Sequence, residues 1–376
     1  MPLEPMRLLR FGFTVLLAMQ SCGLLVAAPP SGLVVGWGDN SSGAVTGLAS
    51  SGNSTGVVVV AGQVLTNVVA ISAGRDHALA LRSDGTVVAW GNNRFGQTTV
   101  PAGLTDAVAI AAGGWQSLAL RRDGTVVYWG NTEDGQGSVP SGLTNVVAIA
   151  AGGAHSLALK RDGTLVVWGD MRTYRALPDG LSNLVAIAAG PSVECRDLAI
   201  RSDGTVVEWS AQGGSIEIGE RVPHEENGER GFLVEATHVH AIEGLSNVSA
   251  IVVGGTHSLA IERDGTVVQW QPGDNVNAGT RISMAASPPA PNGLVTIGGH
   301  ILSNVVSVAA GSPIGDSGRP VKRASLALDR HGTVAAWGNI DRLHAATVPD
   351  GLSNVVAIAA GPNFCLAITT NEAFGK

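Results

Sequence analysis

The stretch Asn145–Gly169, NVVAIAAGGAHSLALKRDGTLVVWG, is the clearest copy of a unit that recurs along the chain. The first element of the unit begins at Asn67, Asp106, Asn145, Asn183, Asn247, Asn304 and Asn354. A tryptophan ends the unit each time, at Trp37, Trp90, Trp129, Trp168, Trp209, Trp270 and Trp337. The shortest spacing between these tryptophans is 39 residues, which we take as the basic repeat length.

Each copy contains three runs that are typical of β-strands: VVAIAAG, then SLAL, then TVVxWG. Asp-Gly stands between the second and third runs, as at Asp84 and Gly85, and suits the positive φ angles of a two-residue hairpin turn. A fourth, shorter run ends at Val-Pro. The small residues of the first run, such as Ala148 and Ala150, suit a strand that is crowded near a central axis. The pattern predicts an all-β propeller with four-stranded blades.

The two ends of the chain predict how the propeller closes. The last copy, from Asn354, has two strand-like runs but no Trp-Gly strand before Lys376, whereas Leu33–Gly38, LVVGWG, has no partner strands before it. We therefore expect the N-terminal strand to complete the last blade of a seven-bladed ring, because pairing removes two exposed strand edges. The predicted domain is a single propeller over 33–376, with insertions near 210–244, 271–303 and 312–323.

The GGxHSLAL and DGTVVxWGxN signatures resemble the regulator of chromosome condensation repeat family, whose members form seven-bladed propellers. The resemblance covers essentially the whole chain after its first 28 residues. Within that family, Trp90–Leu104, WGNNRFGQTTVPAGL, looks most like secreted bacterial propellers that inhibit β-lactamases. Nuclear members act as nucleotide exchange factors on a small GTPase, so the resemblance also implies an exchange-factor-like regulator as an alternative, although no matching exchange wedge is present.

The N-terminus predicts export. Arg7 and Arg10 precede the apolar run Phe11–Val26, and Ala27 and Ala28 follow it, which is the pattern of a secretory signal peptide over 1–28. The expected product is secreted or periplasmic, monomeric and free of the membrane after leader removal. Of the three cysteines, Cys22 lies in the leader, and we interpret Cys195 and Cys365 as free structural thiols.

Composition excludes some function classes. The net charge of −7 provides no basic surface for phosphates, so we expect no nucleic-acid partner. The sequence contains no nucleophile elbow, phosphate loop, paired catalytic carboxylates or zinc motif, so we assign no catalytic residue, metal site or cofactor. The favoured function is an exported, non-enzymatic module that binds an unidentified protein, with inhibition of a secreted hydrolase as a more specific form. The enzymatic alternative is a glycan- or polysaccharide-active propeller that uses Glu225, Glu226, His238 or His240.

The candidate binding residues lie in the loops opposite the Asp-Gly turns, because these loops vary most in length and sequence. One variable position of these loops holds Asp76, Trp115, Thr256 and Asn363, and Phe364 follows the last of them. Trp115 is the one tryptophan that the repeat does not use, and exposed tryptophans often anchor protein interfaces. The alternative role of Trp115 is to cover a gap between blades.

Two groups of histidines have structural interpretations. His77, His155 and His257 occupy the same place in three copies, which favours a loop-capping hydrogen bond over catalysis. In the insertion 210–244, His238 and His240 would face the same side of a strand near Glu235 and could hold a divalent metal. Their spacing matches no established metal motif, so we interpret this insertion as a solvated acidic loop.

Overall fold

The computed structural model describes residues 31–133, 135–169, 177, 180–191, 196–210, 222–226, 229–233, 240–242, 244–245, 247–255, 257–270, 295–297, 300–311, 324–338, 347–371 and 374. Within these residues the regular structure is all-β, as predicted. None of the described residues forms a helix that is long and apolar enough to cross a membrane. The predicted leader 1–28, Cys22 and Cys195 lie outside the described residues.

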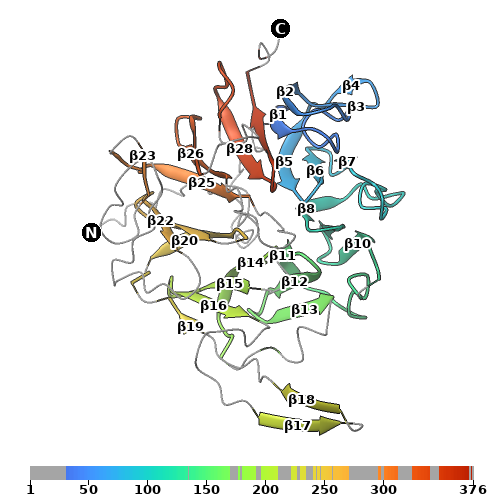
Figure 1. The fold of residues 1–376 in the computed structure, drawn as a ribbon, viewed down its shortest axis with the longest axis vertical. Coiled ribbons are helices and arrows are strands. Elements are labelled where there is room, and N and C mark those ends of the chain that lie inside the picture. The colour runs from blue at the N-terminus through green and yellow to red at the C-terminus, as the bar shows by residue number, and fades with distance from the viewer. Residues whose placement is uncertain are drawn as a thin grey trace, which may run out of the picture.

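Within the described residues, seven antiparallel sheets have three or four strands, and Figure 1 shows them arranged around a common centre. Three of them are formed by β5 (Val68–Ala73), β6 (His77–Arg82) and β7 (Val87–Gly91); by β8 (Ala107–Ala112), β9 (Gln116–Arg121) and β10 (Val126–Gly130); and by β11 (Val146–Ala151), β12 (His155–Lys160) and β13 (Leu165–Gly169). The next three are formed by β14 (Leu184–Ala188), β15 (Arg196–Arg201), β16 (Val206–Ser210) and β19 (His240–Ala241); by β20 (Val248–Val253), β21 (Ser258–Glu262) and β22 (Val267–Trp270); and by β25 (Val305–Ala310), β26 (Ala324–Asp329) and β27 (Val334–Gly338).

The remaining large sheet joins the two ends of the chain, and we call it the terminal sheet. Its strands, in spatial order, are β2 (Asn53–Val57), β1 (Leu33–Asp39), β29 (Phe364–Thr369) and β28 (Val355–Ala360). β1 pairs with β29 over six residues, from Leu33 opposite Thr369 to Gly38 opposite Phe364. The predicted pairing of the N-terminal strand with the last copy is therefore confirmed.

The Asp-Gly turns are present, but they are longer than predicted. In the turn between β6 and β7, the Arg82 N–H donates to the Thr86 carbonyl at 2.9 Å, so three residues form the loop. Only Gly85 of the Asp-Gly pair has a positive φ, +85°. The Asp84 carboxylate instead accepts hydrogen bonds from the Thr86 backbone N–H and hydroxyl. The aspartate therefore stabilises the turn through its side chain rather than through a left-handed backbone.

The fourth run of the repeat is not a strand in most sheets. Within the described residues, two of the seven large sheets have four strands and five have three. In the first repeat, Val100 and Leu104 pack against the apolar cluster of the neighbouring sheets, although the segment between them is irregular. Pro101 has no N–H to donate, and Gly103 has a φ of +79°, so the run packs side chains without pairing its backbone.

Three two-stranded hairpins complete the described strands. They are β3 (Val59–Val60) with β4 (Gln63–Val64), β17 (Val222–Glu226) with β18 (Glu229–Leu233), and β23 (Thr296–Ile297) with β24 (His300–Ile301). Figure 1 shows the β17–β18 hairpin away from the other sheets.

The core lies between neighbouring sheets. All seven repeat tryptophans are buried there, with exposed fractions between 1% and 9%. The strand that carries the first run of each repeat lies at the centre, and in the terminal sheet this strand is β28. Small residues of these strands line a cavity of about 240 Å³. Ala70, Ala109, Ala148 and Ala186 are among the lining residues, which agrees with the prediction that this strand is crowded near an axis.

Candidate functional site

The two ends of the sheets carry different connections, and we name them by what they carry. The loop face contains the loops that join first and second strands, such as 74–76 and 113–115, and those that follow third strands, such as 92–98. The turn face contains the Asp-Gly turns. Trp115 immediately precedes β9 and Arg122 immediately follows it, so these residues lie on the loop face and the turn face respectively.

Four side chains form a row on the loop face. The guanidinium carbon of Arg75 lies 5.0 Å from the centroid of the Trp115 ring. The Trp115 and Phe95 rings have centroids 5.8 Å apart and are tilted by 55°. The guanidinium carbon of Arg94 lies 5.4 Å from the centroid of the Phe95 ring. Two aromatic rings are thus flanked by two cations, and we call Arg75, Trp115, Phe95 and Arg94 the cation–aromatic row.

A strip of acidic and polar groups extends the row toward the terminal sheet. The Arg75 Nε lies 3.5 Å from the Asp76 carboxylate. Burial raises the pKa of Asp76, Arg75 opposes that rise, and the negative charge of Asp39 adds to it. The Asp39 N–H donates to the carbonyl of Asn363 at 2.9 Å.

The structure therefore connects three of the predicted binding residues through adjacent groups. Trp115, Asp76 and Asn363 are all half-buried and lie along the row and its extension. Thr256 lies outside the described residues. The role predicted for Phe364 is wrong, because its side chain is 2% exposed and packs in an apolar cluster with Ala78 and Leu366.

The sequence reasoning missed Asp39, Arg75, Arg94 and Phe95. Arg94 and Phe95 lie in WGNNRFGQ, which was compared with inhibitor propellers only as a motif, and Arg75 immediately precedes a residue that was selected. The missing information was spatial, because Arg94 and Trp115 are far enough apart in sequence to belong to different repeats. Only the packing of neighbouring sheets shows that Phe95 reaches the Trp115 ring.

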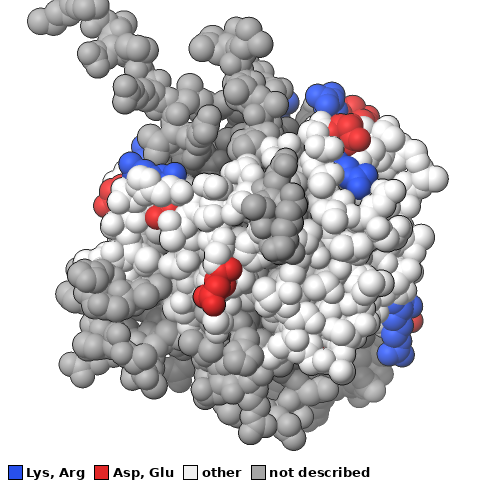
Figure 2. All heavy atoms as spheres, turned by 90° about the horizontal axis from the view of Figure 1, so that it is seen from above, with Lys and Arg blue, Asp and Glu red and all other residues white. Residues whose placement is uncertain are grey.

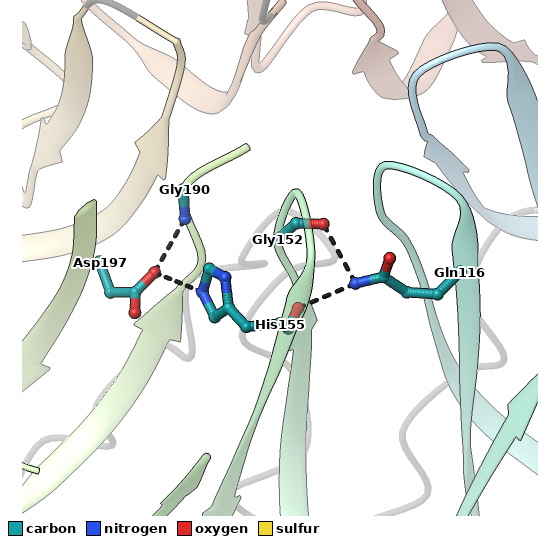
Figure 3. A network of polar contacts seen from close by, with 5 residues as sticks. All are labelled: Gln116, Gly152, His155, Gly190 and Asp197. Atoms are coloured by element: carbon teal, nitrogen blue, oxygen red, sulfur yellow. Dashed lines mark hydrogen bonds and ion pairs between the residues drawn. The ribbon is translucent and has the colours of Figure 1, made fainter. Parts of the chain in front are cut away.

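The recurring histidines form buried hydrogen bonds between sheets. His77 Nε2 lies 3.0 Å from Ser117 Oγ, His155 Nε2 lies 2.9 Å from Asp197 Oδ1, and His257 Nε2 lies 2.7 Å from Ser325 Oγ. Figure 3 shows the His155 contact, in which Asp197 also accepts from the Gly190 N–H at 2.9 Å. The structural role predicted for these histidines is confirmed, but their partners lie in the next sheet rather than in their own loop.

Other residue types make the same connection. In Figure 3 the Gln116 amide donates to the carbonyls of Gly152 and His155 in the next sheet. Arg196 donates to the Ser258 hydroxyl at 2.9 Å and lies 3.7 Å from Glu208. Burial lowers the pKa of His77 to about 4, so this imidazole is neutral at neutral pH. A neutral, buried ring without solvent access serves packing rather than proton transfer.

The acidic insertion is described only in part. The backbone of the β17–β18 hairpin includes Glu225 and Glu226, and His240 begins β19, but the side chains of 222–240 and all of His238 and Glu235 lie outside the description. Within the described residues, no group of three His, Cys, Asp or Glu side chains could hold a metal ion. The Cys365 thiol is buried, and burial raises its pKa.

Charge on the described surface is sparse. On the side of the molecule that Figure 2 shows, charged residues lie in small separate groups among uncharged ones. Both signs occur in these groups. The cation–aromatic row is therefore a local concentration of charge and aromatic area, in a chain of which only 14% is charged.

Comparison with known proteins agrees with this architecture. Residues 68–97 and 146–173 match the regulator of chromosome condensation (RCC1) repeat. Prp20p from Saccharomyces cerevisiae is 19% identical with a TM-score of 0.63, over 91% of this chain and 92% of that chain. Human WBSCR16 is 17% identical with a TM-score of 0.59, over 90% of this chain and 99% of that chain. No curated protein sequence matches this chain.

Similar sheets that repeat around a centre define the class of protein as a repeat propeller. Two stretches of the chain match the regulator of chromosome condensation repeat, and solved structures of that repeat class share the fold, so the resemblance seen in the sequence is confirmed. At these identities the solved structures show the fold alone.

Proposed function

We propose that this protein is an exported, non-enzymatic propeller that binds a protein partner through its loop face. The cation–aromatic row carries this proposal, because half-buried tryptophan and arginine side chains on a rigid scaffold are the residue types that dominate binding energy at protein interfaces. The scaffold is proposed to be a closed ring of seven blades, in which most outer segments pack as irregular chain rather than as a fourth strand.

Related folds support a protein partner. Solved structures that share this fold include yeast Prp20p, which was characterised for its binding to Gsp1p and histones, and a complex of Kap60 with yeast Prp20. These partners belong to those proteins. For this chain they favour protein binding in general, and an exchange-factor-like role rests on fold analogy alone.

Export rests on the leader. Arg7, Arg10 and the apolar run that follows favour removal of about the first 28 residues. Intact-mass measurement of the mature protein tests this step. A full-length cytoplasmic product would contradict export without affecting the binding proposal.

Inhibition of a secreted hydrolase is the specific form of the proposal that the Trp90–Leu104 motif favours. The experiment is a panel of secreted hydrolases, including β-lactamases, assayed with the mature propeller and with its Trp115→Ala variant. Inhibition that the substitution weakens at least tenfold would support the loop face as the inhibitory surface. If no enzyme in the panel is inhibited, the hydrolase form is removed and the partner must be sought in another class.

A further inference from the structure

The two ends of the cation–aromatic row differ in charge, and this difference restricts what the row can bind. Arg75 is held at one end by Asp76, with the Asp39 carboxylate near enough to influence Asp76. Arg94, at the other end, is exposed. Among the described residues, Arg94 pairs with no carboxylate, and its guanidinium group lies over the Phe95 ring. One end of the row is therefore neutralised and the other end carries an unneutralised positive charge.

The arrangement of the rings disfavours a flat ligand. Arg75 covers one face of Trp115, and Phe95 packs against the same indole at a tilt of 55°. A sugar ring or a nucleobase stacks on an open aromatic face, and Arg75 already covers one face of the Trp115 ring. The accessible parts of the half-buried rings suit an aliphatic or aromatic side chain, which needs no parallel platform.

The geometry of Arg94 suits a carboxylate. A guanidinium group that lies over an aromatic ring keeps its N–H donors at its edge, where they can bond a carboxylate with two parallel hydrogen bonds. In a protein with a net charge of −7, an unpaired exposed arginine beside aromatic rings also gives an acidic partner a local attraction that most of the surface lacks.

From these contacts we infer that the row binds a protein segment in which an aspartate or glutamate lies next to an apolar side chain. The apolar side chain contacts Trp115 and Phe95, and the carboxylate bonds to Arg94. This inference rests on the proposed function, because it specifies the chemistry of the partner at the same face.

The experiment is selection of a phage-displayed library of random peptides on the folded propeller, followed by sequencing. The probe variants are Trp115→Ala and Arg94→Glu. The control is Arg122→Glu, which makes the same charge change at an exposed residue on the turn face. A thermal melt of each variant verifies folding before selection.

We expect the selected peptides to be enriched in Asp or Glu within two positions of an apolar residue. Trp115→Ala and Arg94→Glu should each reduce retention of these peptides about tenfold or more, whereas Arg122→Glu should change it less than about twofold. Selection on the Arg94→Glu variant should favour Lys or Arg at the position where wild type favours an acid.

Three outcomes would overturn the inference, and they have different consequences for the proposed function. Peptides that require Trp115 but show no acidic preference would remove the acidic partner and leave the binding face in place. Peptides whose retention is unchanged by Trp115→Ala would contradict both the acidic partner and the proposed binding face. Retention of glycans on the propeller, with no peptide selected, would replace a protein partner with a carbohydrate.

Discussion

The contacts between neighbouring sheets are of two kinds, and their distribution separates the terminal sheet from the rest. At five sheet-to-sheet contacts, a polar residue at or just before the start of one second strand bonds to the next sheet: His77, Gln116, His155, Arg196 and His257. At the two contacts that flank the terminal sheet, the equivalent residues are Ala324, which shares an apolar cluster with Cys365, and Phe364, which shares one with Ala78.

This difference shows that residues in separate repeats are matched to each other. His77 faces the hydroxyl of Ser117. Phe364 occupies the same place in its own repeat, but it packs in one apolar cluster with the methyl group of Ala78. A buried imidazole opposite a methyl group would lose its hydrogen-bond partner, and this loss costs more than an apolar pair of similar shape. The matching therefore helps to specify which sheets are neighbours. The apolar contacts of the terminal sheet lack that directional requirement.

The largest expected effect comes from removing the strand that joins the two ends of the chain. Deletion of residues 31–39 removes β1 and exposes the edge of β29 over the six paired residues. We expect loss of the cooperative thermal transition or aggregation, because the terminal sheet then lacks its central strand. Circular dichroism melts measure this effect. The control is deletion of residues 1–30, and a cooperative melt near the control temperature after loss of β1 would contradict the prediction.

The polar contacts should make stability depend on pH. An unfolded histidine binds a proton below a pKa of 6.5, whereas buried His77 stays neutral down to about pH 4. The unfolded state therefore binds more protons in this interval, and the free energy of unfolding falls as the pH falls from about 6.5 to 4. For His77 alone the expected loss is about 3 kcal/mol.

The matched variant for this measurement is His77→Gln, since Gln116 already occupies the equivalent place in the next repeat. Urea unfolding at pH 7 and pH 4.5 should show a smaller pH dependence for the variant than for the wild type. The turn aspartates do not produce this difference, because their pKa values are lowered from 3.8 by hydrogen bonds with threonine and they titrate below the interval. An equal pH dependence in both proteins would show that His77 is not protonated on unfolding in this range.

Replacing a polar contact between sheets by an apolar one should have a smaller effect on the free energy of unfolding, because the second substitution offsets part of the loss caused by the first. Ser117→Ala removes a hydroxyl that lies 3.0 Å from His77 Nε2, and we expect it to cost about 1–2 kcal/mol by leaving a buried nitrogen without its partner. Adding His77→Phe copies the Phe364–Ala78 pair and should recover about 1 kcal/mol, because the polar group is then absent.

The local packing supports this exchange. Gly74 lies against the His77 ring as Gly361 lies against the Phe364 ring, and an added Cβ would come within 2.5 Å of Cε1 in each case. A phenyl ring at position 77 thus has the same space as the phenyl ring already present at 364. Urea unfolding of the two single variants and the double variant gives the coupling energy. Additive effects would show that the two contact types are not matched.

Much of the fold could be predicted because it depends on local patterns. The apolar runs, the Asp-Gly turns and the position of LVVGWG predicted the strand order of each sheet and the pairing of β1 with β29. The fourth strand was overestimated because Val-Pro reads as the end of a strand, although Pro101 cannot donate to a ladder and Gly103 turns the chain.

The candidate site was less predictable because its contacts are between repeats. His155 finds Asp197 and Phe95 finds Trp115 across sheets, and no spacing within one repeat encodes these distances. Phe364 was misassigned for the same reason. Its position is variable in sequence, but it is the buried position that faces the next sheet, whereas the residue before it lies on the loop face.

The smallest expected effect on stability is that of Trp115→Ala, and comparing it with Trp129→Ala distinguishes a loop-face tryptophan from a core tryptophan. Trp129 is 6% exposed and its indole N–H donates to the Gln97 carbonyl at 2.9 Å, so Trp129→Ala should destabilise the fold by about 3–5 kcal/mol. Trp115 is half-buried and contacts Arg75 and Phe95, so Trp115→Ala should cost no more than about 1 kcal/mol while it weakens partner binding. Thermal melts and a binding assay on the same two variants test the distinction.

If Trp115→Ala melts as low as Trp129→Ala, Trp115 closes a gap between sheets, and the binding face must lie elsewhere among the loops. If it melts like the wild type and binding is lost, the indole acts at the interface, because the row is then dispensable for the contacts that hold the sheets together.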